Sequence, residues 1–200
     1  KIKKNYEKWI AHFQNWKEKY PIVEENYYKQ SKNVNPYVFM LKLSEKTGKN
    51  DILIPDASAN LIWAMQAFYL KGQRVFTALN HSPMGYSMPA TIGAYMADKK
   101  NKNIICTIGD GSMQMNIQEL ATISHLKIPA KIFVLNNKGY GLIKQTQDMW
   151  LNSRRVGVDS KSDLAMPDLI KISKAYGIET VEINNHNDLD YKIDHVLNSN

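Results

Sequence analysis

Two hundred residues suit one α/β domain that is large enough to bury a hydrophobic core. The net charge of +7 comes from lysines mixed with Asn and Glu along the chain, a pattern typical of a solvated surface, so we expect no nucleic-acid partner. No apolar run reaches the ~20 residues that span a bilayer, so we expect no membrane partner, and the single cysteine, Cys106, fits a cytoplasmic protein without disulfides.

The N-terminal part, residues 1–34, is expected to be a helix followed by a linker. Large apolar side chains recur every three or four residues from Tyr6 to Tyr20, which predicts one apolar face of a helix. Residues 22–34 are polar and irregular, so we interpret them as the linker. An Asn-Pro pair that begins at Asn35 supplies a helix cap and a first-turn proline, and it predicts the start of the next helix.

Residues 35–200 are expected to form a doubly wound α/β domain, with a mainly parallel sheet and helices on both faces, because strand-like and helix-like segments alternate. Strands are predicted at 51–54, 74–77, 103–108, 131–136 and 179–183, and helices at 36–48, 60–70, 86–98, 114–125, 140–150, 167–176 and 188–198. The last helix has no strand after it, and the chain begins without methionine, so we expect a fragment of a larger multidomain protein.

The most informative feature is a pair of polar motifs that follow two neighbouring predicted strands. Gly109-Asp110-Gly111 ends one apolar run, and Asn137 ends the next, with a helix-length segment between them. Because ligands of open parallel sheets bind beyond the carboxyl ends of the strands, Asp110 and Asn137 are expected side by side at that edge. A carboxylate and an amide oxygen suit Mg²⁺, which prefers hard oxygen ligands. Each motif alone also suits an ordinary turn, but together they predict a site.

A diphosphate that is bound through such a cation needs close backbone approach and N–H donors. Gly109 and Gly111 remove side chains where the backbone must come near a ligand. Ser112 and the N–H groups after it would begin a helix, whose N-terminus favours phosphate. The backbone carbonyl of Gly139, two residues beyond Asn137, is the third oxygen expected near the cation.

At these residues the sequence resembles the thiamine diphosphate (ThDP) binding motif of ThDP-dependent enzymes. The stretch from Gly109 to Leu120, GDGSMQMNIQEL, is similar to the acetolactate synthase (acetohydroxyacid synthase) branch, and the resemblance covers nearly the whole chain. It implies the thiamine diphosphate-binding fold and the cofactors ThDP and Mg²⁺. It also implies that Asp110, Asn137 and the Gly139 carbonyl are the ligands of the metal, and it leaves open whether FAD binds.

The resemblance assigns further cofactor contacts to three segments. Ser58 and Asn60 lie where acetolactate synthases usually have Gly-Gln-His in a loop that holds the diphosphate, although Ser58 alone also suits a plain helix cap. Met84 matches the apolar residue that bends ThDP, and the backbone of Ser82 and Met84 would contact the aminopyrimidine ring. The third segment follows the Asn pair and consists of Gly139, Tyr140 and Gly141.

The function implied by the resemblance is that of an acetolactate synthase-like transferase. Such an enzyme decarboxylates a 2-oxo acid such as pyruvate and ligates the two-carbon unit to a second carbonyl. A ThDP-dependent decarboxylase or lyase is an alternative, and so is a noncatalytic module. These alternatives stay open because Ser58-Ala59-Asn60 departs from Gly-Gln-His and Thr146 stands where acetolactate synthases usually carry Trp.

The resemblance also implies a partner. Family members take an activating glutamate from the pyrimidine-binding domain, which is usually supplied by a partner subunit, and no glutamate of this chain can be given that role. We therefore assign no catalytic residue within the chain and expect the chain alone to be inactive. In the full-length protein we expect a homodimer or a homotetramer.

Overall fold

The computed structural model describes residues 3–97 and 103–199. The described residues contain one parallel sheet with the strand order β2-β1-β3-β4. Its strands are β1 (Ile52–Pro55), β2 (Arg74–Val75), β3 (Ile104–Gly109) and β4 (Ala130–Leu135). In the register, Ile54 pairs with Cys106, which in turn pairs with Ile132. All four residues of β1 and nearly all of β3 are buried, as expected for parallel strands that are covered on both faces.

One face of the sheet is covered by three helices, which are α3 (Pro36–Glu45), α4 (Ala59–Ala67) and α10 (Leu189–Asn198). Leu53, Ile105 and Phe133 point from the strands into this layer. The ring centroid of Phe133 lies 5.3 Å from that of Phe39 on α3, so strand and helix meet through an aromatic pair.

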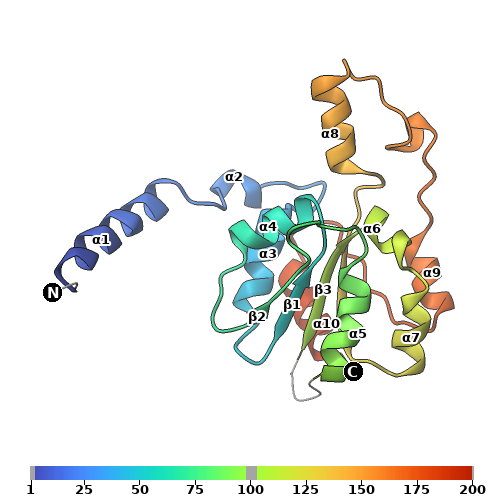
Figure 1. Ribbon diagram of the computed structural model, residues 1–200, viewed down its shortest axis with the longest axis horizontal. Coiled ribbons are helices and arrows are strands. Elements are labelled where there is room, and N and C mark those ends of the chain that lie inside the picture. The colour runs from blue at the N-terminus through green and yellow to red at the C-terminus, as the bar shows by residue number, and fades with distance from the viewer. Residues whose placement is uncertain (1–2, 98–102, 200) are drawn as a thin grey trace.

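The opposite face carries four helices, which are α5 (Ser87–Ala97), α6 (Asp110–Met115), α7 (Glu119–His125) and α9 (Leu169–Ala175) (Figure 1). The strand residues Ile54, Cys106 and Ile132 point into this layer. Successive side chains of a strand alternate between the two faces, so the same strands supply both hydrophobic layers. The doubly wound α/β fold with a parallel sheet is therefore confirmed.

The predicted N-terminal helix forms as α1 (Lys3–Lys19), but its aromatic face is not buried on the domain. Trp9 is 63% exposed and Trp16 is 55% exposed, and Figure 1 shows α1 standing apart from the sheet. The predicted irregular linker contains a short helix, α2 (Glu25–Tyr28), because Tyr27 packs against the α3 layer and its ring stacks on Tyr37. Among the described residues, no helix is long and apolar enough to cross a membrane.

The predicted strand at 179–183 is wrong. In the structure these residues form no ladder with β4, which is the edge of the sheet as described. Ile183 packs instead into the layer formed by α3 and α10, and the carbonyl of Glu182 accepts a hydrogen bond from Lys192 Nζ at 2.6 Å. These contacts bury the apolar side chain and hold the segment without strand pairing.

The single helix predicted at 114–125 is also wrong in detail, because two helices occupy this part of the chain. The first, α6, begins already at Asp110, and the second, α7, begins at Glu119. The chain leaves the helical conformation at Asn116, whose φ is −136° and whose side chain bonds to the Gly85 carbonyl. The other predicted helices and strands form within a few residues of their expected ends, and residue 98 of the predicted helix 86–98 lies outside the described residues.

Cys106 is fully buried in β3, where its thiol donates a hydrogen bond to Ser87 Oγ at 3.2 Å. Burial raises the pKa of the Cys106 thiol to about 12. We therefore expect no modification of Cys106 by a disulfide reagent such as DTNB in the native protein at mildly alkaline pH. In guanidinium chloride the single thiol of the chain should react fully. Rapid labelling of the native protein would show that the β3 layer opens.

Candidate functional site

The two predicted metal-ligating side chains lie together at the carboxyl end of β3 and β4. Gly109 pairs with Leu135, so both strands leave the sheet at the same level. Asp110 Oδ2 accepts the backbone N–H of Gly139 at 3.0 Å, and Asn137 Oδ1 accepts the same N–H at 3.2 Å. One N–H group thus joins the carboxylate and the amide oxygen, and it places Gly139 between them.

Asp110 is a buried carboxylate without a cationic partner. Its exposed fraction is 3%, and it takes part in none of the ion pairs found in the described parts of the chain. Burial raises the pKa of Asp110, while hydrogen bonds from the backbone N–H groups of Gly111 and Gly139 act in the opposite direction. A buried carboxylate without an opposite charge is costly, and a divalent cation would supply that charge.

The donor set fits Mg²⁺ and does not resemble a site built from several charged ligands. The residues that the structure describes contain no group of three or more His, Cys, Asp or Glu side chains placed to hold a metal ion. One carboxylate, one amide and one backbone carbonyl would leave coordination positions for phosphate oxygens and water. This is the way in which Mg²⁺ is usually bound in phosphate-binding enzymes.

The glycines of the motif differ in what their missing side chains would meet. A Cβ on Gly111 would lie 2.4 Å from Tyr140 Cε1, and a Cβ on Gly139 would lie 2.2 Å from the Val158 carbonyl oxygen. A Cβ on Gly109 would have no atom within 4 Å. Gly139 is thus required by the packing of the protein itself, a side chain at Gly111 would have to displace the Tyr140 ring, and Gly109 leaves open space beside the backbone.

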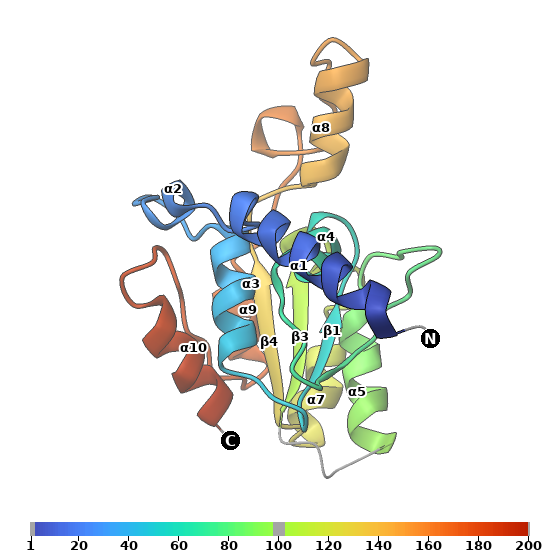
Figure 2. The same ribbon diagram turned by 90° about the vertical axis from the view of Figure 1, so that its left-hand side faces the viewer.

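The turn that carries Gly139 is braced by the projecting segment that follows it. This segment contains α8 (Gly141–Trp150) and the 3₁₀-helix η1 (Ser160–Ser162), and it extends away from the sheet (Figures 1 and 2). The N–H of Tyr140 donates to the Val158 carbonyl at 3.0 Å. Lys144 Nζ lies 2.8 Å from Asp159 Oδ2, and hydrogen bonds from Lys144, which have the largest effect, and from Ser162 lower the pKa of Asp159 to about 2.

Ser58 and Asn60 follow β1 but differ in their surroundings. Ser58 is exposed with φ 66° and ψ −146°, and its side chain makes no capping hydrogen bond to α4. Asn60 is buried, and its Nδ2 donates to the Thr107 carbonyl at 2.6 Å. Its Oδ1 has no hydrogen-bond partner among the described residues. The Asn60 side-chain N–H is thus bonded within the protein, while Ser58 is exposed and does not cap α4.

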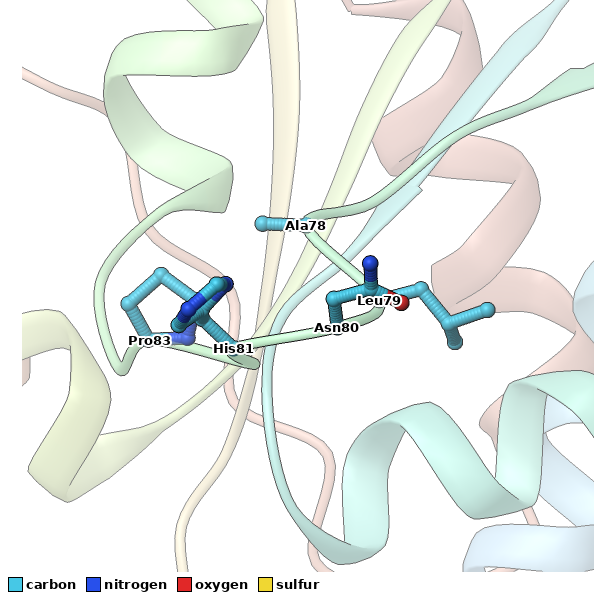
Figure 3. Close-up of a pocket in the computed structure, with 5 residues that line it drawn as sticks. All are labelled: Ala78, Leu79, Asn80, His81 and Pro83. Atoms are coloured by element: carbon cyan, nitrogen blue, oxygen red, sulfur yellow. The ribbon is translucent and has the colours of Figure 1, made fainter.

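Ser82 and Met84 lie half-buried in the loop between β2 and α5. The same loop borders a surface hollow of about 390 Å³, lined by Ala78, Leu79, Asn80, His81 and Pro83 (Figure 3). Ser82 has a φ of 42°, a left-handed conformation that shapes the turn before Met84. The predicted ring-contacting residues therefore lie beside an open hollow at the end of the sheet.

Two residues that join the loops of the candidate site, Asp56 and Asn116, are not among those predicted from the sequence. Asp56 accepts hydrogen bonds from the Met84 segment, and Asn116 donates one to it from the end of α6. Their signals were present, since Asp56 directly follows a strand and Asn116 is a poor helix former inside a predicted helix. Neither signal says which distant segment the side chain contacts.

Comparison with known proteins identifies the family of the chain. The family model described as thiamine pyrophosphate enzyme, C-terminal TPP binding domain, matches residues 56–200. The acetolactate synthase large subunit of Cyanidium caldarium is 30% identical over 191 residues, which cover 96% of this chain and 32% of that protein. The corresponding subunit of Lactococcus lactis is 31% identical over 186 residues, which cover 92% and 31%. The isozyme 1 large subunit of Escherichia coli is 33% identical over 150 residues, which cover 74% and 26%.

The chain therefore spans between about a quarter and a third of the length of these relatives. The match to the family model begins directly after β1 and includes β2, β3, β4 and every residue from Asp110 to Asn137. The chain belongs to the thiamine pyrophosphate enzymes and contains their C-terminal TPP-binding domain, in a form similar to that of acetolactate synthase large subunits.

Proposed function

We propose that this chain binds the diphosphate of ThDP through Mg²⁺, as part of an enzyme that decarboxylates a 2-oxo acid such as pyruvate and ligates the two-carbon unit to a second carbonyl. The observation that carries the proposal is that the Gly139 N–H donates to both Asp110 and Asn137, so that the two side chains lie together. ThDP, when bound, acts as the electron sink for cleavage beside a carbonyl group. Asp110, Asn137 and the Gly139 carbonyl would hold the cation, and the N-terminal N–H groups of α6 would face the phosphates.

The ring of ThDP and a partner subunit complete the proposed function. Met84 would support the ring, with the backbone of Ser82 and Met84 on its polar edge. A pyrimidine-binding domain of a partner subunit would supply the activating glutamate, so the complete protein would be a homodimer or homotetramer in the cytoplasm.

Calorimetry on the complete protein tests the cofactor part of the proposal. We expect ThDP to bind in the presence of Mg²⁺ and to bind far more weakly after removal of the metal with EDTA. Metal-independent binding, or none, would overturn the proposal. Product analysis with pyruvate then distinguishes the reactions, because ligation gives a new carbon–carbon bond and simple decarboxylation gives an aldehyde.

A noncatalytic module is the second candidate, and one observation favours it. The Asn60 amide, for which the resemblance implies a contact with the diphosphate, is bonded to Thr107 instead. A noncatalytic protein would bind ThDP with Mg²⁺ weakly or not at all, and it would release no CO₂ from pyruvate. CO₂ release by the complete protein would exclude this candidate.

A further inference from the structure

The peptide groups around Gly85 are held on both sides by residues outside the predicted site. The N–H of Gly85 donates to Asp56 Oδ1 at 3.0 Å, and the carbonyl of Gly85 accepts from Asn116 Nδ2 at 3.0 Å. Gly85 has a φ of 88°, and a Cβ at this position would lie 2.9 Å from Asn116 Nδ2 and from Met115 Cβ. The loop after β2 is thus fixed between the loop after β1 and the end of α6.

Asp56, the first of these two residues, is held by several hydrogen bonds. Asp56 is fully buried, and its carboxylate accepts three hydrogen bonds, from Gly85 N–H, Ser87 N–H and Ser87 Oγ. Its own N–H donates to the Thr107 carbonyl at 2.8 Å, which extends the bonding of β1 to β3 by one residue. The three donors offset the cost of burying a carboxylate that has no ion pair among the described residues. Asp56 therefore ties the loop to the frame of the sheet.

The Asn116 side connects the same loop to the helix that begins with Asp110. Asn116 lies at the break between α6 and α7, so its side chain can reach a residue outside these two helices. Asn116 is only half-buried, so its amide can be removed without emptying the core. Asn116 thus bridges the α6 end of the metal-binding segment to the Met84 loop.

The hydrogen bond from the Gly85 N–H to Asp56 also determines the orientation of the Met84 carbonyl group. The N–H of Gly85 belongs to the planar peptide that contains the Met84 carbonyl. Fixing this N–H therefore fixes the direction of the Met84 carbonyl, which has no other freedom within that plane. The backbone of Met84, which is expected to contact the aminopyrimidine ring, is therefore held at its next peptide by Asp56, with Asn116 bonded to the carbonyl beyond it.

We propose that Asp56 and Asn116 are positioning residues that hold the loop at Gly85 and thereby place the backbone of Met84 for the ring of ThDP, an inference that rests on the proposed function. The metal site does not need this peptide. Loss of either side chain should therefore weaken the binding of ThDP, which carries the ring, and spare the binding of inorganic pyrophosphate with Mg²⁺, which lacks it.

The test compares Asn116→Ala with Asn198→Ala in the complete protein. Asn198 is a matched control, because its Nδ2 also donates to one backbone carbonyl, that of Asp194, at 2.8 Å on α10. We expect Asn116→Ala to weaken ThDP binding at saturating Mg²⁺ about tenfold, the lower end of the effect of removing a supporting contact. Calorimetric affinity for Mg²⁺-pyrophosphate should stay unchanged, and Asn198→Ala should alter neither.

Amide hydrogen exchange without cofactor supplies a second readout. Exchange at Gly85 and Ser87 should become faster in Asn116→Ala and stay as in the wild type in Asn198→Ala. Asp56→Asn, which leaves one N–H of the loop without an acceptor, should act in the same direction if it folds.

Unchanged exchange at Gly85, or an equal loss of affinity for ThDP and pyrophosphate in Asn116→Ala, would overturn the inference while leaving the proposed function in place. Failure of the wild-type protein to bind ThDP with Mg²⁺ would overturn the proposed function and this inference with it.

Discussion

Replacing Asp110 with Asn should abolish Mg²⁺-dependent binding of ThDP without unfolding the protein. The change removes the one charged oxygen of the expected ligand set but keeps the shape and an oxygen that can accept the Gly139 N–H. We expect the affinity for ThDP to fall at least ~100-fold, or about 2.7 kcal/mol, because even supporting contacts of a metal site contribute ~10- to 100-fold. Burial of a neutral amide costs less than burial of a carboxylate, so the melting temperature should stay equal or rise.

Asp163→Asn is the control for this prediction. Asp163 is exposed and has a φ of 65°, a left-handed conformation that Asn adopts readily. Asp163→Asn therefore removes one negative charge, as Asp110→Asn does, without changing the fold or the candidate site. Calorimetric titration of both variants with ThDP and Mg²⁺ should show a loss for Asp110→Asn alone. Equal affinities in the two variants would exclude Asp110 as a metal ligand.

Gly139→Ala should lower both the stability of the protein and its affinity for the cofactor. The new Cβ would lie 2.2 Å from the Val158 carbonyl oxygen, a backbone atom that cannot rotate away. Either the loop around Val158 or the turn at Gly139 must move, and the turn carries the N–H shared by Asp110 and Asn137. We expect a loss of about 1–3 kcal/mol in the free energy of unfolding, as is typical of overpacking, together with loss of Mg²⁺-ThDP binding.

Gly109→Ala provides the comparison within the same motif. A Cβ at Gly109 meets no atom within 4 Å, so denaturant titration should show a change in stability of no more than about 0.5 kcal/mol. If the two glycine variants prove equally stable, the close contact between Gly139 and Val158 is not a constraint on the fold.

The pairing of Asp110 with Asn137 could be predicted from the sequence because it depends on topology alone. Parallel neighbouring strands bring their carboxyl ends to one edge, whatever the details of packing. The placement of Asn60 could not be predicted, since it depends on how α4 is rotated about its axis, and that rotation turns the Asn60 amide toward Thr107.

The errors in the fold have a similar cause. The alternating side chains at 179–183 suit a strand, but the burial of Ile183 against helices satisfies the same pattern. The break at Asn116 arises from a bond to Gly85, a residue 31 positions away in the chain. Contacts between distant segments depend on tertiary packing, and the spacing of residues within one segment does not predict them.

The strand order has a consequence for how the molecule assembles. β3 and β4 are joined by one short crossover through α6 and α7, whereas β1 reaches β3 only after the chain has passed through α4, β2 and α5. Closing a longer loop costs more entropy, and it slows the formation of non-local pairs. We therefore expect the carboxylate and the amide to meet early during folding, before the Met84 loop is fastened to Asp56. During folding, the chain would therefore be able to bind a cation before it can bind the coenzyme.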